Sequence, residues 1–305
     1  MRRSLFFAAL LCASAASAET LRVEVWYPAA SDSAAALRSI QVEPFGGDAG
    51  DDLTVQVEDA LRAVDLGQGR YFQVIPAATG SGGEALLRGT ADTEMRYSDY
   101  SEEHERCIKD GDGKCTAVKE KITVKCGRRH VELVVALRLV ARDGTLLWSD
   151  NRPEVYDDSY CEDAEGPPRS RGAITRELNA KVARRLRLDF APRRASEDVR
   201  VDENRKGLSK EDASIFKQAV RAVKDGQEAA ACASWSALDS MGPKHAPTLF
   251  NIGLCAESGG DDAAAADHYR AVLSISPRHA YALQGLDRIA ARERARRQLA
   301  AHAAD

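Results

Sequence analysis

The chain has 305 residues, of which 43 are basic and 47 acidic, so its formal net charge is −4. This length is sufficient for two ordinary domains, and the near balance of charge argues against a general attraction to nucleic acid. Beyond the first residues, no stretch approaches the ~18 consecutive apolar residues of a membrane helix. We therefore expect a protein that does not span a membrane.

Residues 1–18 have the features of a secretory signal peptide. Arg2 and Arg3 precede the apolar run Leu5–Leu11, and Ala16-Ser-Ala18 provides the small residues of a cleavage site. We expect the mature chain to begin at Glu19. Cys12 follows a large residue, so we do not expect it to be lipidated.

Removal of the signal leaves six of the seven cysteines. An even number of cysteines in an exported chain predicts disulfides rather than metal thiolates. The expected location is the bacterial periplasm, where the protein either is free or associates with the outer membrane. A eukaryotic secretory route is the weaker alternative.

Alternating apolar residues predict strands, and apolar residues at helical spacing predict helices. Asp51 and Asp52 suit the first turn of a helix, because carboxylates there meet free backbone amides. Gly67 and Gly69 follow this helix. The expected strands are Leu21–Tyr27, Ser39–Phe45, Arg70–Pro76 and one beginning at Ala85, and the second helix is expected over Arg171–Leu188.

A long hairpin is expected between Lys121 and Tyr160. Its turn is Asp143-Gly144, a pair that favours the tight turns of hairpins. If these two residues form the loop, the numbers of facing residues add up to 287. Val140 then faces Leu147, and Cys126 faces Cys161. We interpret residues 98–120, which precede the hairpin, as a polar insertion.

These elements predict an α+β domain over residues 19–190, with a mixed sheet and helices on one face. Residues 191–210 are rich in charge and contain Pro192, so we interpret them as a linker. The remaining residues, 211–305, are rich in alanine and helix formers. The chain is therefore expected to continue as an all-α domain.

A repeat runs through this second domain with the tetratricopeptide (TPR) period of about 34 residues. We expect two repeats, at 212–245 and 246–279, and a capping helix at 280–300. Two repeats with a cap make a short stack. The pairs that define the period are Gly226 and Gly260, Ala231 and Ala265, Trp235 and Tyr269, and Pro243 and Pro277.

The first domain resembles the amino-terminal domain of TolB and the curli-secretion lipoprotein (CsgG-like) superfamily over roughly residues 38–190. The resemblance implies an envelope protein that binds other envelope proteins, and it supplies no catalytic residues. The chain departs from the family in its cysteine-bearing insertion and in lacking a convincing lipid site. The residues that carry it are Ile40-x-Val42-x-Pro44-Phe45, Phe72-x-Val74-Ile75, Leu86-Leu87-x-Gly89, and the hairpin from Leu137-x-Leu139-Val140 to Gly144-x-Leu146.

Three disulfides are expected. Cys126–Cys161 follows from the hairpin pairing. Cys232–Cys255 follows from the repeat, which places the two residues on adjacent helices. Cys107–Cys115 is the pair that remains.

Other candidate sites favour structural interpretations. Asp110-Gly-Asp-Gly113 lacks the third acid and the distant glutamate of a calcium loop, so a solvated turn is expected. Gly80-Ser-Gly-Gly83 lacks the Lys-Ser/Thr ending of a phosphate loop. The potential zinc ligands are not spaced as in structural zinc sites, and an exposed rim is expected of the acids near the hairpin end. The potential zinc ligands are His104, Cys107, Cys115, Cys126 and His130. The acids near the hairpin end are Asp157, Asp158, Glu162, Asp163 and Glu165.

Residues of the first helix of each repeat are expected to line a concave surface and to hold a partner peptide. The alternative is that this apolar stripe packs against the amino-terminal domain or a second copy of the chain. A homo-oligomer remains compatible with the sequence. The expected partner-binding residues are Phe216, Val220, Phe250, Leu254, Gln284 and Arg288.

No Gly-x-Ser-x-Gly or His-Glu-x-x-His motif is present, and we expect neither an enzyme nor a cofactor or metal. The leading hypothesis is a periplasmic adaptor that binds a protein or peptide through its helical repeats. One alternative is a subunit of an outer-membrane secretion or assembly complex. Another is an envelope hydrolase whose acids meet only in the folded chain.

Overall fold

The computed structural model describes residues 19–67, 69–76, 82–164, 166–242 and 244–303. The expected signal peptide, Cys12, Pro243 and Glu165 lie outside these residues, as do the first two residues of the Gly80–Gly83 loop. The described chain forms two compact units. One comprises residues 19–27 and 194–293, and the other residues 28–193 and 294–303.

The second of these, the sheet unit, is built on a mixed sheet with strand order β3-β2-β4-β5-β6, in which β7 also pairs with β5. β2 runs parallel to β3 and β4, while β5 is antiparallel to β4, β6 and β7. This is the expected α+β class. Its strands are β2 (Ser39–Val42), β3 (Gln73–Pro76), β4 (Ala85–Lys109), β5 (Cys115–Ala141), β6 (Leu146–Asp150) and β7 (Glu154–Cys161).

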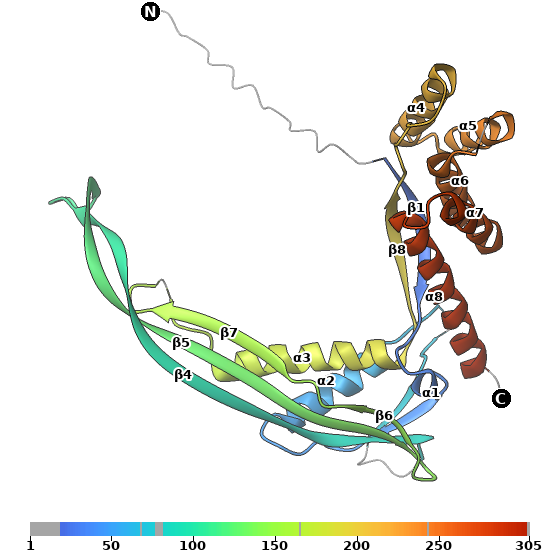
Figure 1. Ribbon diagram of the computed structural model, residues 1–305. Coiled ribbons are helices and arrows are strands. Elements are labelled where there is room, and N and C mark those ends of the chain that lie inside the picture. Colours follow the sequence, from blue (N-terminus) through green and yellow to red (C-terminus); the bar gives the residue numbers. More distant parts are fainter. Residues whose placement is uncertain (1–18, 68, 77–81, 165, 243, 304–305) are drawn as a thin grey trace, which may run out of the picture. The chain divides into compact units, whose positions relative to one another are not determined.

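Helices α2 (Gly50–Arg62) and α3 (Arg171–Phe190) cover one face of this sheet (Figure 1). Leu53, Val57 and Leu61 of α2 are fully buried, as are the apolar residues of α3 at helical spacing, Ile174, Leu178, Val182 and Leu186. The hydroxyl of Ser170 accepts a hydrogen bond from the amide of Ala173 and so caps the amino-terminal end of α3. The helix begins at the next residue, Arg171. A short helix, α1 (Asp32–Ala35), precedes β2.

The long hairpin has the expected pairing over most of its length. Leu139 faces Trp148, and Cys126 faces Cys161. At the turn the prediction is wrong by one residue, because a bulge after Leu139 places Val140 opposite Leu146 instead of Leu147. The extra residue of a bulge changes the pairing locally and leaves the distant pairing intact.

The expected polar insertion at residues 98–120 is wrong. These residues complete β4 and β5, which pair antiparallel from Ala85 opposite Ala141 to Lys109 opposite Cys115. Asp110–Gly113 is a turn whose Asp110 carboxylate accepts hydrogen bonds from the amides of Asp112 and Lys114. The two strands thus continue beyond α3 as a curved two-stranded ribbon (Figure 1).

The other unit, the helical unit, combines five helices with a two-stranded sheet of β1 (Thr20–Tyr27) and β8 (Arg193–Arg200). β8 lies inside residues 191–210, where we expected only a linker. The last helix, α8, contributes its final residues to the sheet unit, where Leu299 packs on the core. The helices are α4 (Lys210–Lys224), α5 (Glu228–Met241), α6 (Ala246–Ser258), α7 (Asp262–Ile275) and α8 (Ala280–Ala303).

All three expected disulfides are present: Cys107–Cys115, Cys126–Cys161 and Cys232–Cys255. Their sulfur atoms are covalently paired, so in this oxidised form the cysteines are not thiolate ligands for zinc. Within the described residues, no helix is both long and apolar enough to cross a membrane.

Candidate functional site

The apolar stripe expected to hold a partner is part of the core of the helical unit. Phe216, Phe250 and Leu254 are fully buried, and Val220 is 9% exposed. They belong to one cluster with Leu21, Val23 and Val25 of β1, together with the helices. These side chains are therefore buried rather than exposed. Their cluster includes β1, which lies within the residues assigned to the amino-terminal domain, so the burial agrees with the alternative interpretation of the stripe.

Side chains of the helices also hold the backbone of this covering strand. The hydroxyl of Ser258 donates to the carbonyl of Arg22 at 2.7 Å, and the Arg292 guanidinium donates to the carbonyl of Glu24 at 2.9 Å. These bonds occupy backbone carbonyls that pairing with β8 leaves free. An extended segment of the same chain, β1, thus packs against the helices of this unit, including α4 and α6.

Arg288, which was expected to bind the partner, lies in a buried ion-pair cluster. Arg288 makes two hydrogen bonds to Glu257, at 2.9 and 2.6 Å, and Arg292 adds a third at 2.8 Å. Burial alone would raise the pKa of Glu257, but these guanidinium groups and the Tyr269 hydroxyl hold that pKa below its usual 4.5. Gln284, the other residue expected there, is exposed.

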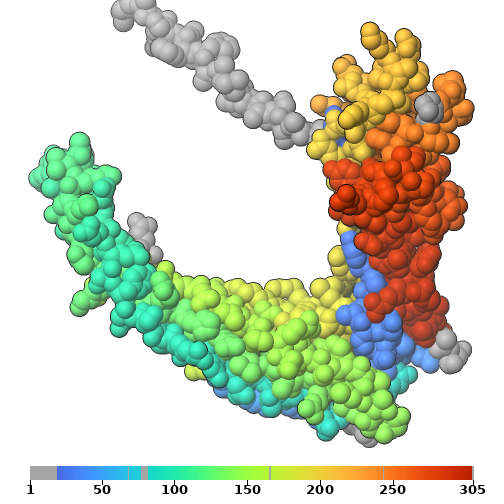
Figure 2. All heavy atoms as spheres, in the orientation of Figure 1, coloured from blue at the N-terminus to red at the C-terminus, as the bar shows by residue number. Residues whose placement is uncertain are grey.

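The ribbon formed by the outer parts of β4 and β5 is the feature of the sheet unit that packing does not explain. From Tyr97 outward most side chains are exposed, whereas in the preceding part of β4 every second residue is buried or half-buried. The residues Tyr97–Lys109 span roughly 40 Å at about 3.3 Å per residue. Figure 2 shows this end of the ribbon extending past the rest of its unit. We call residues 97–125 the arm.

Ion pairs between β4 and β5 stabilise the arm. Glu103 pairs with Lys121 at 3.1 Å, Glu105 with Lys119 at 3.0 Å, and Arg106 with Glu120 at 2.8 Å. All six side chains are well exposed, so each pair contributes little free energy. Two-stranded ribbons are marginally stable in water on their own, and the disulfides at the tip and the base stabilise this one further.

Large apolar side chains are nevertheless exposed on the arm. Tyr97 and Val118 are each 61% exposed, and Ile108 is 41% exposed. Near the base, a shallow cavity of about 750 Å³ separates the arm from the segment before α3. Its lining includes Asp99, Ser101, Lys125, Tyr160 and Pro168.

The acids near the hairpin end pair with bases at the base of the arm. Arg129 binds Asp158 through two hydrogen bonds, at 3.0 and 2.6 Å, and this pairing lowers the pKa of that carboxyl. His130 contacts Asp157 at 2.8 Å. The acidic rim expected from the sequence is thus mainly exposed and carries its own counter-charges.

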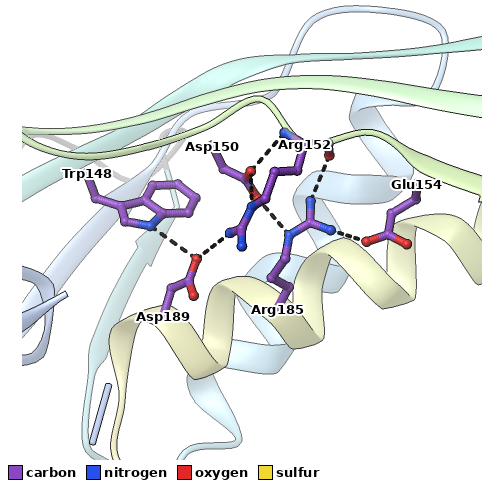
Figure 3. Close-up of polar contacts among 6 residues, drawn as sticks. All are labelled: Trp148, Asp150, Arg152, Glu154, Arg185 and Asp189. Atoms are coloured by element: carbon purple, nitrogen blue, oxygen red, sulfur yellow. Dashed lines mark hydrogen bonds and ion pairs between the residues drawn. The ribbon is translucent and has the colours of Figure 1, made fainter. Parts of the chain in front are cut away.

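A second cluster of charges joins α3 to the gap between β6 and β7 (Figure 3). The buried carboxylate of Asp150 accepts hydrogen bonds from Arg152 at 2.8 Å and from Arg185 of α3 at 2.9 Å. Arg152 also binds Asp189, which accepts a further bond from the Trp148 indole. Arg185 contacts Glu154 as well, so its guanidinium spans the interruption between the two strands.

Sequence reasoning missed both the arm and this cluster. The residues of the arm carry charge on both faces, so their pattern lacks the alternation of a half-buried strand. The ion pairs join residues far apart in the chain, such as Asp150 and Arg185, whose proximity requires the fold. The one available signal for the cluster was Pro153, which marks the interruption after β6.

Comparisons with known proteins identify no family. No family model and no curated protein matches the chain. Among solved structures, the chain is similar to one described as a neuraminyllactose-binding hemagglutinin homologue from Helicobacter pylori. The match covers 52% of this chain and 83% of that chain at 11% identity, with a TM-score of 0.25.

Proposed function

We propose that this protein is a non-enzymatic adaptor of the cell envelope, exported to the periplasm, that binds another envelope protein through the arm. The observation that carries the proposal is the length of the arm, in which Val124 near the base is buried and most other side chains are exposed. Without a core beneath it, the arm contributes little to stability. Two disulfides hold it in an extended form, which suits a surface that reaches for a partner.

The chemistry of the arm supports protein binding. Exposed aromatic and aliphatic side chains, such as Tyr97 and Val118, lie beside paired charges. Apolar anchors within a polar rim are typical of protein–protein interfaces. Backbone groups on the outer edges of a two-stranded ribbon are also free to pair with an added strand.

We propose that α4–α7 are two TPR-like repeats with α8 as their cap. Trp235 and Tyr269, which occupy equivalent positions of the two repeats, are both fully buried, and Gly226 and Gly260 both have positive φ angles after their helices. Since the apolar residues expected to bind the partner are buried in a core that includes β1, we assign partner binding to the arm rather than to these helices. The repeats then serve to hold β1 and β8.

The proposal is tested by shortening the arm without disturbing its base. Residues 103–123 are replaced by Asn-Gly, which joins Glu102 to Val124, two residues that face each other. A photo-crosslinker placed at Val118 of the intact protein, in cells of the native host, should capture a defined envelope protein. The shortened variant, probed by affinity capture, should lose that protein while its melting temperature stays unchanged.

Val55 provides the matched control, since it is 59% exposed on α2 of the same unit. A crosslinker at Val55 should not capture the same protein. If the shortened variant retains its partner, the arm is not the binding surface. Ring-shaped oligomers of the intact protein in detergent extracts would instead favour a subunit of an outer-membrane assembly.

A further inference from the structure

Four potential metal ligands meet at the base of the arm. Glu102 and His104 of β4 lie next to Cys126 of β5 and Cys161 of β7, and one ligand atom from each lies within 4.8 Å of all the others. The ligand atoms of a tetrahedral zinc site are roughly 3–4 Å apart, because zinc–ligand bonds are about 2.0–2.3 Å long. Within the described part of the chain, no other group of three or more histidine, cysteine, aspartate or glutamate side chains lies close enough together to share a metal ion.

The sheet pairing brings these residues together. Cys126 faces Cys161 on one side and Tyr100 on the other, while Glu102 faces Val124 and His104 faces Ile122. Side chains two residues apart on a strand lie on the same face. Glu102, His104 and Cys126 therefore share one face with Cys161, although three different strands supply them.

The imidazole of His104 is oriented by a carboxylate, as metal-binding histidines usually are. Its Nδ1 lies 2.7 Å from Asp163, and its Nε2 lies 3.3 Å from Glu102. A hydrogen bond from Nδ1–H to a carboxylate leaves Nε2 with the lone pair that a metal requires. Asp163 thus prepares Nε2 for a ligand on the side where Glu102 lies.

In the structure the two sulfur atoms form a disulfide, which is not a thiolate ligand. We propose that the reduced form of this site binds a zinc-class divalent cation through Cys126, Cys161, His104 and Glu102. A dithiol supplies two electrons and two protons, the S–S bond breaks into two thiols, and the dithiol becomes a disulfide. The cation then replaces the two thiol protons, which are released to water.

Such a site would hold β5 to β7 at the base of the arm under reducing conditions, as the disulfide does under oxidising ones. A set of two thiolates, one imidazole and one carboxylate matches the preferences of zinc. The inference does not depend on the proposed function, since it concerns what the base of the arm binds and not what the arm reaches.

The other two cysteine pairs allow a sharp test on the full mature chain. One variant replaces Cys107, Cys115, Cys232 and Cys255 by serine, which leaves Cys126 and Cys161 as the only cysteines of residues 19–305. After anaerobic reduction with a phosphine, it is titrated with Zn²⁺ against a chromophoric chelator and with Co²⁺ by absorption. We expect a single ion per chain, thiolate-to-cobalt charge transfer, and no binding before reduction.

Three further changes in that background assign the ligands. His104→Ala should weaken Zn²⁺ binding by roughly a hundredfold or more, and Asp163→Asn by roughly tenfold, because the latter only orients the ring. Glu105→Gln is the control, since that exposed carboxylate pairs with Lys119 and should leave the affinity unchanged. If the reduced four-serine variant binds no zinc, or if His104→Ala binds as tightly as its parent, the site does not exist.

Discussion

Two carboxylates, Glu257 and Asp150, are almost fully enclosed in their units, with side chains 0% and 1% exposed. Each is held by two arginines. A buried ion is tolerated only where hydrogen bonds replace the water that it loses. Both carboxylates join parts of the chain that are distant in sequence, so their pairing fixes how those parts fit together.

Replacing Glu257 with glutamine should destabilise the helical unit by about 3–5 kcal/mol, because Arg288 then lacks its buried counter-charge and Arg292 keeps only its pairing with Asp262. Urea unfolding followed by tryptophan fluorescence measures this. Glu293→Gln, an exposed change on α8, should alter the free energy of unfolding by less than ~0.5 kcal/mol. Equal effects of the two changes would contradict the assigned role.

The same carboxylate predicts how the stability of the unit depends on pH. The pKa of Glu257 in the folded state lies below 4.5, its usual value. Its contribution is therefore fully present above about pH 4.5 and is lost as the pH falls through the lower folded pKa. The difference in stability between the wild type and Glu257→Gln should narrow over that range, as measured by urea unfolding at successive pH values.

At the scale of single elements, α3 is tied to the sheet by Arg185. Changing Arg185 to methionine keeps much of its packing but leaves Asp150 with Arg152 as its remaining cation. We expect a loss of roughly 2–4 kcal/mol, which chemical denaturation should detect. The neighbouring Arg184 is exposed, so Arg184→Met should have little effect, and similar losses in both variants would argue against the cluster.

The disulfides of the arm should differ in what they stabilise. Removing Cys126–Cys161 by serine substitution should cost about 4 kcal/mol in the chain-entropy model, because it closes the longer loop. Removing Cys107–Cys115 should leave the melting temperature nearly unchanged, since the tip has no core. Faster hydrogen exchange confined to the outer arm would confirm this difference, whereas a large shift in melting temperature would contradict it.

Where an element buries one face, its sequence predicted it. The turn at Asp143-Gly144 and the alternation along Val131–Leu139 gave the pairing that joins Cys126 to Cys161, because a period of two has a single solution when one face is apolar. The arm and β8 were missed because neither has an apolar face of its own. In β8, only Ala195 and Val199 are apolar on the side that contacts the helices.

At the scale of the whole chain, each unit is assembled from separate stretches of sequence. Strand β1 completes the helical unit, although residues 28–193, which belong to the other unit, separate it from the rest of the helical unit in the chain. This arrangement explains why the expected binding groove was wrong. The local sequence pattern predicted a row of apolar side chains on these helices. It did not predict that β1 packs against them, because that contact joins segments far apart in the chain.

Placing a charge on the buried side of β1 should therefore unfold the helical unit selectively. Val23→Lys places an ammonium among apolar residues of the core, and we expect faster exchange and proteolysis in α4–α7 with little change in α2 and α3. Arg22→Ala, on the exposed side of the strand, is the control. If hydrogen exchange and proteolysis increased equally in both units of the Val23→Lys variant, the two units would unfold together and the prediction would be wrong.

The burial of β1 by helices that follow much later in the sequence also has a kinetic consequence. During synthesis β1 emerges before any other described element, yet the helices that bury Leu21, Val23 and Val25 emerge last. Contacts so distant in sequence form slowly, because a long loop must close first. Until residues near 290 are able to fold, the apolar side chains of this edge strand remain without cover. The unfolded chain thus carries an aggregation-prone segment at Thr20–Tyr27, of the kind that a holding chaperone shields.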